Sequence, residues 1–379
     1  MIERLLVCRS RSFDPYENLA LEEALLNRVG EGELILYLWQ NERSVVIGRN
    51  QNPWKECRTA LLAEEGGRLA RRLSGGGAVF HDLGNLNFTF LMPAADYDLL
   101  RQLTVIERAC QSLGIPAARS GRNDLLADGR KFSGSAFYKH AGKAYHHGTL
   151  MVDVDLEMVQ RYLRPSKAKL AAKGVDSVRS RVVNLREFVP DLTIPRLADA
   201  LIAALAEVYA EATGNRQQAT GDRQQATGNE TPVGAVIDRP PIRENLPDMS
   251  LRDQSADWSW QSVSPGPVQM LNVDDPDLLS LTEKYASDAW LYGPKLPFTL
   301  SVEDRFPWGG IEIQLDVNEG VIQSAKVYTD AMDETLAERL ERRLIGSAFR
   351  REALDECVQG ADLSDRQIAD LRALLRKAL

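Results

Sequence analysis

The chain has 379 residues, of which 44% are hydrophobic and 26% charged, and its formal net charge is −8. This length exceeds one ordinary domain and predicts two. The negative charge argues against nonspecific nucleic-acid binding as the main role. The richest apolar segment begins at Leu197 and is interrupted by Asp199 and Glu207, so no membrane span is expected. The first residues include too short an apolar stretch for a signal peptide, and we therefore expect a cytoplasmic protein.

Cysteine and histidine spacing argues against a structural metal site and a disulfide framework. The cysteines lie far apart and form no C-x-x-C pair, and the histidines form no H-x-x-x-H pair. The neighbouring His146 and His147 would point to opposite faces of a strand. The four cysteines, which we expect to be core or surface thiols, are Cys8, Cys57, Cys110 and Cys357.

Hydrophobic spacing in the first two-thirds of the chain alternates between helix and strand patterns. Helices are predicted for residues 17–29 and 99–115, the second ended by Gly114, and strands for residues 33–40, 44–47 and 84–92. Leu86, Phe88 and Phe90 alternate as in a half-buried strand. Residues 123–154 contain several short strands separated by glycine turns, which is typical of an antiparallel sheet. This part is therefore predicted to be α+β.

The composition changes abruptly near residue 213. Residues 214–229 contain two copies of RQQATG at a seven-residue period, with only an alanine where a coiled coil needs two apolar seam positions. We interpret Thr213–Pro267 as a polar low-complexity insertion or linker without catalytic content.

Regular patterns return after the insertion. A helix is predicted for residues 274–290, and the YGPKLP stretch at residues 292–297 marks a boundary that could act as a hinge. Strand patterns at 311–317 and 321–329 precede amphipathic helices at 335–346 and 366–379. These elements predict a small C-terminal α+β domain.

The stretch RRLSGGGAVFHD at residues 71–82 places two arginines and a serine before three glycines. A bare glycine triplet more often marks a flexible surface turn. Here, however, the arginines can bind phosphate or carboxylate, and successive glycine N–H groups can form an anion-binding nest. The sequence contains neither a P-loop motif nor a dinucleotide-binding G-x-G-x-x-G between a strand and a helix.

Two further features favour a site for anions. Lys131 stands between a turn and the small residues SGSA, which favours a lysine that points into a pocket, although most lysines are solvated and idle. Asp124 could hold Mg²⁺ or bond its own turn backbone. Residues 161–186 carry eight basic residues and one acidic residue, a bias that fits a triphosphate or an acidic partner domain, or simply a solvated face.

Four motifs in this order, RRLSGGGAVFHDLGN, NDLLADGRKFSGSA, HHGTLMVDVD and KLAAKGVDSVRSRVVNL, closely resemble lipoate-protein ligases. The resemblance covers most of residues 1–211 and returns from about residue 274, where DRFPWGGIEI resembles the accessory domain of the family. It implies an α+β fold of the biotin/lipoyl ligase type, with a mixed, largely antiparallel sheet and a small C-terminal α+β accessory domain. We expect a catalytic domain over residues 1–292, interrupted at about 213–267, and an accessory domain over residues 297–379.

The resemblance also implies a reaction. Lipoate-protein ligases activate free lipoate with ATP to lipoyl-adenylate and transfer the lipoyl group to a lysine of a carrier domain. The implied carriers are the acyltransferase subunits of 2-oxoacid dehydrogenase complexes and the glycine cleavage H protein. ATP and Mg²⁺ are expected as co-substrate and activator, without a tightly bound prosthetic group, and the protein is expected to be a monomer.

By resemblance, Lys131 is the catalytic residue that reaches both the lipoyl carboxyl and the α-phosphate. Asp124 is the implied Mg²⁺ ligand. The implied ATP or adenylate site comprises Arg72, Gly76, Gly77, Ala78, Val79, Phe80, Asn123, Asp124 and Lys131. The implied lipoate site comprises Arg72, Val79, His81, Lys131 and His147, although a packing role for His147 is equally compatible with the sequence.

Two alternatives remain at this stage. An octanoyltransferase that draws octanoyl groups from acyl carrier protein would need no ATP, but such enzymes typically use a thiol beside the pocket lysine, and no cysteine lies near Lys131 or His147 in the sequence. A noncatalytic carrier-binding module would be marked by loss of Lys131 or of the glycine loop, and both are intact. The glycine- and arginine-rich loop of biotin ligases is absent.

We predict that deleting residues 213–267 and joining the ends with a short flexible linker leaves adenylate formation nearly unchanged. The polar repeat buries too little surface to support the core, and stability depends only weakly on loop length. Adenylate formation and the thermal midpoint of the deletion variant would be measured beside those of the full chain. A large loss of activity in a folded deletion variant would show that the insertion reaches the active site.

Overall fold

The computed structural model describes residues 2–120, 124–164, 182–210, 268–271, 276–293 and 298–379. Asn123, the RQQATG insertion, most of the basic segment and residues 294–297 of the predicted hinge lie outside the described residues. Among the helices that are described, none combines the length and the apolar character needed to cross a membrane.

A mixed eight-stranded sheet forms the larger part of the molecule, in the order β11-β1-β2-β6-β10-β9-β8-β7. β1 pairs in parallel with β2 and β11, and the other neighbours pair antiparallel, which confirms the predicted mixed, largely antiparallel sheet. The strands are β1 (Arg4–Arg9), β2 (Glu33–Trp39), β6 (Asn85–Pro93), β7 (Ala117–Ser120), β8 (Asp124–Ala127), β9 (Arg130–His140), β10 (Lys143–Met151) and β11 (Val268–Met270).

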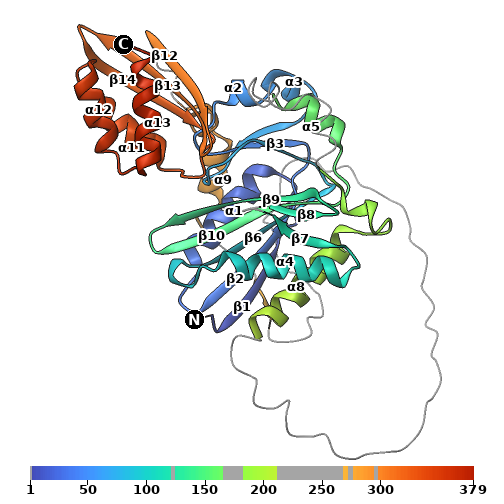
Figure 1. The fold of residues 1–379 in the computed structure, drawn as a ribbon. Coiled ribbons are helices and arrows are strands. Elements are labelled where there is room, and N and C mark those ends of the chain that lie inside the picture. Colours follow the sequence, from blue (N-terminus) through green and yellow to red (C-terminus); the bar gives the residue numbers. More distant parts are fainter. Residues whose placement is uncertain (1, 121–123, 165–181, 211–267, 272–275, 294–297) are drawn as a thin grey trace, which may run out of the picture.

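Helices cover both faces of this sheet. One face packs on α4 (Leu99–Ser112) and α8 (Ile194–Ala210), which in Figure 1 lie on the opposite side of the sheet from the C-terminal elements. The other face packs on α1 (Pro15–Arg28) and α9 (Leu278–Ala286). Because β6 lies in the middle of the sheet, its residues from Asn85 to Met92 are all buried, and the expectation of a half-buried strand was wrong.

A three-stranded sheet, in the order β4-β3-β5, lies beside the large one. Its strands are β3 (Ser44–Ile47), β4 (Arg68–Arg71) and β5 (Val79–His81). The outward face of this sheet, which carries Phe80, packs on aromatic and aliphatic side chains that include Tyr162. The short helices nearby are α2 (Pro53–Glu56), α3 (Thr59–Glu64) and α5 (Leu156–Tyr162).

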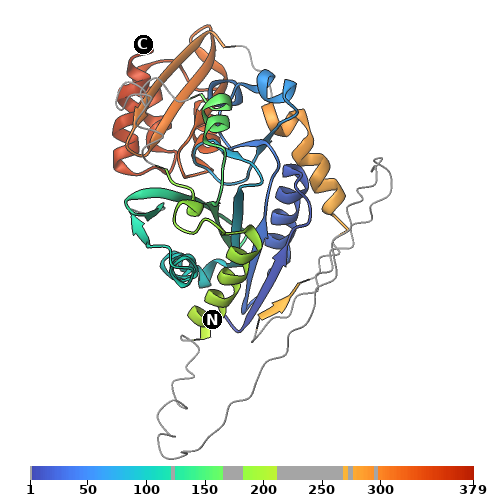
Figure 2. The ribbon, with the colours of Figure 1, turned by 90° about the vertical axis from the view of Figure 1, so that its right-hand side faces the viewer.

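The C-terminal elements have a hydrophobic core of their own. The antiparallel strands β12 (Leu300–Phe306), β13 (Gly309–Asn318) and β14 (Val321–Thr329) pack on α11 (Leu336–Leu344), α12 (Arg351–Gln359) and α13 (Asp365–Arg376). Figure 2 shows these elements packed beside the larger sheet rather than within it. The predicted small α+β arrangement is confirmed, whereas β12 and α12 had not been predicted.

One detail of the predicted elements changes and another is confirmed. Residues 274–290 were predicted as one helix, but α9 ends at Ala286 and α10 (Asp288–Tyr292) follows, because the Ser287 side chain accepts a hydrogen bond from the Trp290 N–H and caps a new helix. The predicted end of α4 is confirmed: the helix stops at Ser112, and Gly114 adopts a φ of 84°. Two 3-10 turns, Ala94–Asp96 and Leu185–Glu187, complete the regular structure of the described residues.

Candidate functional site

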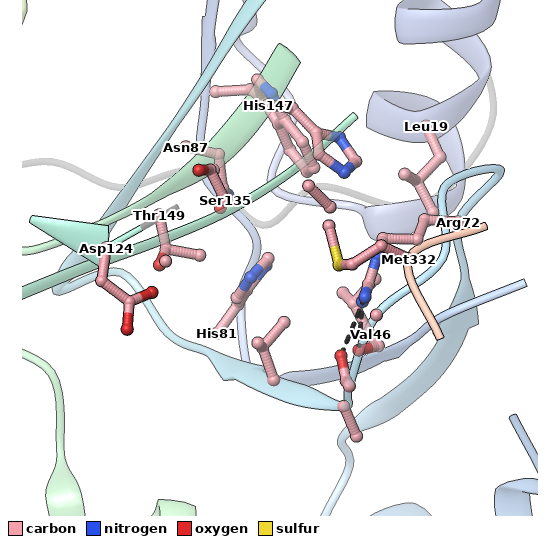
Figure 3. A pocket seen from close by; sticks show the side chains of 18 of the residues that line it. Leu19, Val46, Arg72, His81, Asn87, Asp124, Ser135, His147, Thr149 and Met332 are labelled. Atoms are coloured by element: carbon pink, nitrogen blue, oxygen red, sulfur yellow. Dashed lines mark hydrogen bonds between the residues drawn. The ribbon is translucent and has the colours of Figure 1, made fainter. Parts of the chain in front are cut away.

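A cavity of about 330 Å³ opens between the large sheet, the three-stranded sheet and α1. Figure 3 shows Asp124 and Thr149 on one side of it and Leu19, Arg72 and Met332 on the other. Every described residue of the predicted site except Phe80 lines this cavity: Arg72, Gly76, Gly77, Ala78, Val79, His81, Asp124, Lys131 and His147. Phe80 points away from it because successive side chains of β5 alternate between the two faces of the small sheet.

A β-bulge turns Lys131 toward the cavity. Leu125 of β8 pairs with Ser133 and Leu126 pairs with Lys131, so Phe132 has no partner on β8 and its ring is buried in the core. In a straight strand, Lys131 and Gly134 would lie on opposite faces, yet both line the cavity. The extra residue thus places the ammonium group on the cavity side of the sheet.

Lys131 and Asp124 form an ion pair with an Nζ to Oδ1 distance of 2.7 Å. Their side chains are 39% and 42% exposed, so the pair contributes little to stability. A Cβ on Gly134 would lie 3.0 Å from the Lys131 Nζ, so the glycine makes room for the lysine head. The ammonium group is therefore held at the cavity wall while it remains accessible to an anion.

The buried guanidinium of Arg72 holds the glycine loop, residues 75–77, from inside. Nη2 donates to the carbonyl oxygens of Gly75 and Gly77 at 2.7 and 2.8 Å, and Nη1 donates to the carbonyl of Val46. Burial lowers the pKa of Arg72 to about 10, which leaves it charged at neutral pH. Arg71, by contrast, donates to backbone carbonyls of α10 and of residues 48–51, so its role is structural.

A chain of buried polar side chains extends from Arg72 to α1. Arg72 Nε donates to the Ser74 Oγ, which lies 2.7 Å from His147 Nε2, and His147 Nδ1 lies 2.9 Å from a Glu22 carboxylate oxygen. The same oxygen accepts a hydrogen bond from the Thr89 hydroxyl at 2.7 Å. The proton positions that satisfy this network have Ser74 donating to His147 and His147 donating to Glu22.

The Ser74, His147 and Glu22 contacts have the geometry of a nucleophile, base and acid triad. Ser74, however, is fully buried and does not line the cavity. Its hydroxyl also accepts a hydrogen bond from a guanidinium. We therefore interpret the three residues as a network that fixes the positions of Arg72 and the glycine loop.

A segment from the C-terminal elements, Thr329–Glu334, packs on the glycine loop. The Gly76 N–H donates to the Ala331 carbonyl at 3.1 Å, and Met332 lines the cavity. A Cβ on Gly75 would lie 2.4 Å from the Ala331 carbonyl oxygen. A glycine is therefore needed at position 75 because of a contact within the protein, and at Gly76 because of its φ of 91°. At Gly77 neither reason applies, because a Cβ there would meet nothing within 4 Å.

Several cavity residues were not among the predicted ones, notably Leu19, Trp39, Asn87, Thr149 and Met332. Glu22, which bonds His147, was also missed, although helical spacing places it three residues after Leu19 on the apolar stripe of α1. A carboxylate on such a stripe is a recognisable sequence signal. Met332 has no comparable signal, because it reaches the site from another part of the fold.

Asp124 is the only carboxylate among the described residues that line the cavity. No group of three or more potential ligand side chains occurs among the residues that the structure describes. One carboxylate fits the coordination of Mg²⁺, which commonly takes one or two protein carboxylates together with substrate phosphates and water. It does not fit a metal site built entirely from protein groups.

Family models match both parts of the chain. The lipoyl protein ligase A/B catalytic domain matches residues 14–206, and the bacterial lipoate protein ligase C-terminus matches residues 295–373.

Solved structures of similar fold include LipL1 of P. falciparum in complex with lipoate, at 23% identity and a TM-score of 0.73 over 98% of each chain. A bi-partite lipoate protein ligase from Thermoplasma acidophilum is 22% identical, with a TM-score of 0.56 over 79% of this chain and 100% of that one. A lipoate-protein ligase A bound with ATP is 22% identical, with a TM-score of 0.54 over 77% of this chain and 99% of that one. At these identities the structures establish a shared fold.

We predict that stability falls as the pH is lowered from about 6.5 toward 5. Burial is the main cause that lowers the pKa of His81 and of His146 to about 3, so an unfolded chain binds more protons than the folded one in this range. Each histidine should contribute up to about 1.4 kcal/mol per pH unit to the slope. Urea unfolding at several pH values would measure it. His146→Phe should reduce the slope, and an unchanged slope in this variant would contradict the assignment.

We predict different effects for two neighbouring glycine substitutions. Gly75→Ala forces a methyl group against the Ala331 carbonyl and should lower the free energy of unfolding by about 1–3 kcal/mol. Gly77→Ala, the matched control, meets open space and should change it by no more than about 0.5 kcal/mol. Denaturant unfolding of both variants checks this, and equal effects would rule out a role of Gly75 in seating residues 329–334.

Proposed function

The chain belongs to the lipoate-protein ligase family, with a catalytic part of the lipoyl protein ligase A/B type, and we propose that it activates free lipoate with ATP and transfers the lipoyl group to a carrier lysine. The observation that carries the proposal is the cavity itself. Its walls are largely apolar, with Leu19, Trp39 and Val79 among them, and Lys131 supplies an accessible cation at one side. Such a site suits an acid with a long apolar tail.

In the proposed first step, a lipoate carboxylate oxygen attacks the α-phosphorus of ATP. A new P–O bond forms, the bond to the β-phosphate oxygen breaks, and pyrophosphate leaves. Because both reactants are anions, the site must reduce their repulsion and hold them in line. Lys131, which lines the cavity, would contact both the carboxylate and the phosphate, while the Arg72 guanidinium keeps the glycine loop in place beside them.

In the proposed second step, the amine of a carrier lysine attacks the acyl carbon of the adenylate, an amide bond forms and AMP leaves with the bonding electrons. The proposed carriers are lipoyl domains of 2-oxoacid dehydrogenase complexes and the glycine cleavage H protein. One similar structure belongs to an archaeal lipoylation system described as a bi-partite lipoate protein ligase and its E2 lipoyl domain, which supports a carrier of this kind.

Asp124 would hold Mg²⁺ together with the phosphates of ATP. When bound there, the ion would offset phosphate charge. The carboxylate already lies 2.7 Å from the Lys131 ammonium, so this chain's own residues bring a negative and a positive group to the same side of the cavity. Asn123, proposed with them for the nucleotide, lies outside the described residues.

An octanoyltransferase that works through a cysteine is less well supported by this site. All four cysteines are buried, and none lines the cavity. Burial raises the pKa of Cys8, Cys57 and Cys110 to about 12, which leaves these thiols poor nucleophiles.

We also propose that residues 1–292 and 297–379 act as two domains that change their relative position during the cycle. Their separate hydrophobic cores support the division. Access of a large carrier domain to the adenylate would be a reason for such a movement.

We predict that Lys131→Ala lowers adenylate formation by about a thousandfold or more while the thermal midpoint stays close to that of the parent. An ammonium about 4 Å from an anion contributes on the order of 4 kcal/mol at an effective dielectric near 20. Loss of the exposed pair with Asp124 costs little stability. Lys131→Arg should restore little activity, because the planar guanidinium group of arginine does not replace the compact ammonium group of lysine between two anions. ATP-dependent pyrophosphate release with lipoate, octanoate and biotin is the measurement.

Lys139→Ala is the matched control, because Lys139 lies on the same strand and is exposed outside the cavity. It should retain the parent activity. Activity of folded Lys131→Ala within tenfold of the parent would disprove the central role of Lys131. Release of pyrophosphate with biotin alone, or with none of the three acids, would overturn the proposed function.

A further inference from the structure

Two buried N–H donors among the residues that line the cavity have no hydrogen-bond partner in the described part of the chain. They are His81 Nε2 and Asn87 Nδ2, and the two residues are only 3% and 1% exposed. An unsatisfied buried donor is costly, so such a group in a binding cavity indicates that the ligand or a water supplies the acceptor. Figure 3 shows both side chains at the cavity.

A buried relay fixes which nitrogen of His81 carries the proton. The Tyr37 hydroxyl donates to Asn18 Oδ1, and Asn18 Nδ2 donates to Asn41 Oδ1. Asn41 Nδ2 must then face His81 Nδ1, which lies 3.1 Å away and accepts the hydrogen bond. Nδ1 of the uncharged ring therefore has no proton, and Nε2 is left as the donor.

Asn87 presents the second of these donors, the NH₂ of its amide. Asn85 Nδ2 donates to Asn87 Oδ1 at 2.9 Å, which leaves the Asn87 amide NH₂ as the unpartnered end. Asn87 pairs with Trp39 on β2 and with Thr149 on β10, and all three side chains line the cavity. The Trp39 and His81 rings meet edge to face at 6.1 Å, so both donors lie at the Trp39 end.

The spacing of the strands relates this end to Lys131. The Lys131 Nζ lies over Gly134 of β9, 3.0 Å from where a Cβ of that glycine would be, and Asn87 lies on β6, two strands away across β10. Two strand spacings amount to about 10 Å, a separation that an extended eight-carbon acyl chain spans. An acid whose carboxylate meets Lys131 would therefore bring the far end of its tail to Asn87 and His81.

We propose that His81 and Asn87 determine tail specificity by donating hydrogen bonds to an acceptor atom at the far end of the acyl chain. This inference rests on the proposed function and concerns the same cavity. The dithiolane sulfurs of lipoate are weak acceptors at that position, whereas the methylenes of octanoate are none. Octanoate leaves both donors unsatisfied, and the site therefore prefers lipoate, or any eight-carbon acid with an acceptor there.

The first test uses the unaltered protein and measures kcat/KM for ATP-dependent pyrophosphate release. The acids compared are octanoate, lipoate, and an octanoate with a keto oxygen at a carbon where lipoate carries sulfur. Because oxygen is the stronger acceptor, the keto acid should exceed octanoate by about two- to tenfold. A kcat/KM for the keto acid no higher than that for octanoate would overturn the proposal. The keto oxygen would then lose its hydration in the cavity without gaining a hydrogen bond.

The second test removes each donor. Asn87→Leu and His81→Phe keep similar volumes and should each lower the lipoate to octanoate ratio of kcat/KM by about two- to tenfold. Gln102→Leu, which removes a buried amide on α4 at the opposite face of the sheet, is the control and should keep the parent ratio. Two different variants keep the test valid if one fails to fold, as judged by its thermal midpoint.

The outcomes separate this inference from the proposed function. If the parent releases pyrophosphate with lipoate but the ratio is unchanged in a folded donor variant, a bound water satisfies the donors and the specificity role is wrong. If the parent releases none with any of the acids, the proposed function itself fails. A lowered ratio in the donor variants, together with an unchanged ratio in Gln102→Leu, supports the proposal.

Discussion

The site depends on one buried cation, the guanidinium of Arg72. Glycines without side chains allow a ligand to come close to the backbone of the loop. The same residues leave the loop free to adopt many conformations, because glycine restricts the backbone least. Arg72 fixes one conformation of the loop by donating hydrogen bonds to the carbonyls of Gly75 and Gly77. The charge is tolerated in the interior because each of its nitrogens has an acceptor, and because the network through Ser74 and His147 ends on the Glu22 carboxylate. Without this support the loop would be a flexible turn.

The large sheet contributes by placing chemically different groups in neighbouring rows. Thr89 and His147 pair across β6 and β10, and both contact Glu22, so this row belongs to the polar network. The next row on the same face, two residues along each strand, holds Asn87 and Thr149, which line the cavity. A period of two along each strand thus places the supporting network and further cavity-lining groups in neighbouring rows of one face, and His147 belongs to both.

The elements and the main motifs could be predicted from the sequence, because both depend on local patterns. The spacing of apolar residues gave α1, α4, β2 and β3 close to their observed bounds, and the glycine loop and Lys131 stood out by composition. A Lys131 side chain that points into a pocket was expected, but the β-bulge that turns it there could not be predicted, since it depends on an unpaired Phe132 that appears only once β8 and β9 are in register. The partner of Gly75 could not be predicted either. Gly75 and Ala331 are far apart in the chain, and their contact follows from how the two cores pack.

The contact of the Gly76 N–H with the Ala331 carbonyl has a thermodynamic consequence. A single N–H cannot fully serve both a protein carbonyl and a nucleotide oxygen, so a nucleotide that uses this donor competes with the docked C-terminal segment. Competition of this kind is reciprocal, and each occupant weakens the other by the same factor. The glycine loop then couples two equilibria, although it need not change its own conformation. One is the occupancy of the site, and the other is the docking of residues 329–334. A change that only strengthens docking, far from the cavity, would raise the apparent dissociation constant of any nucleotide that uses this donor.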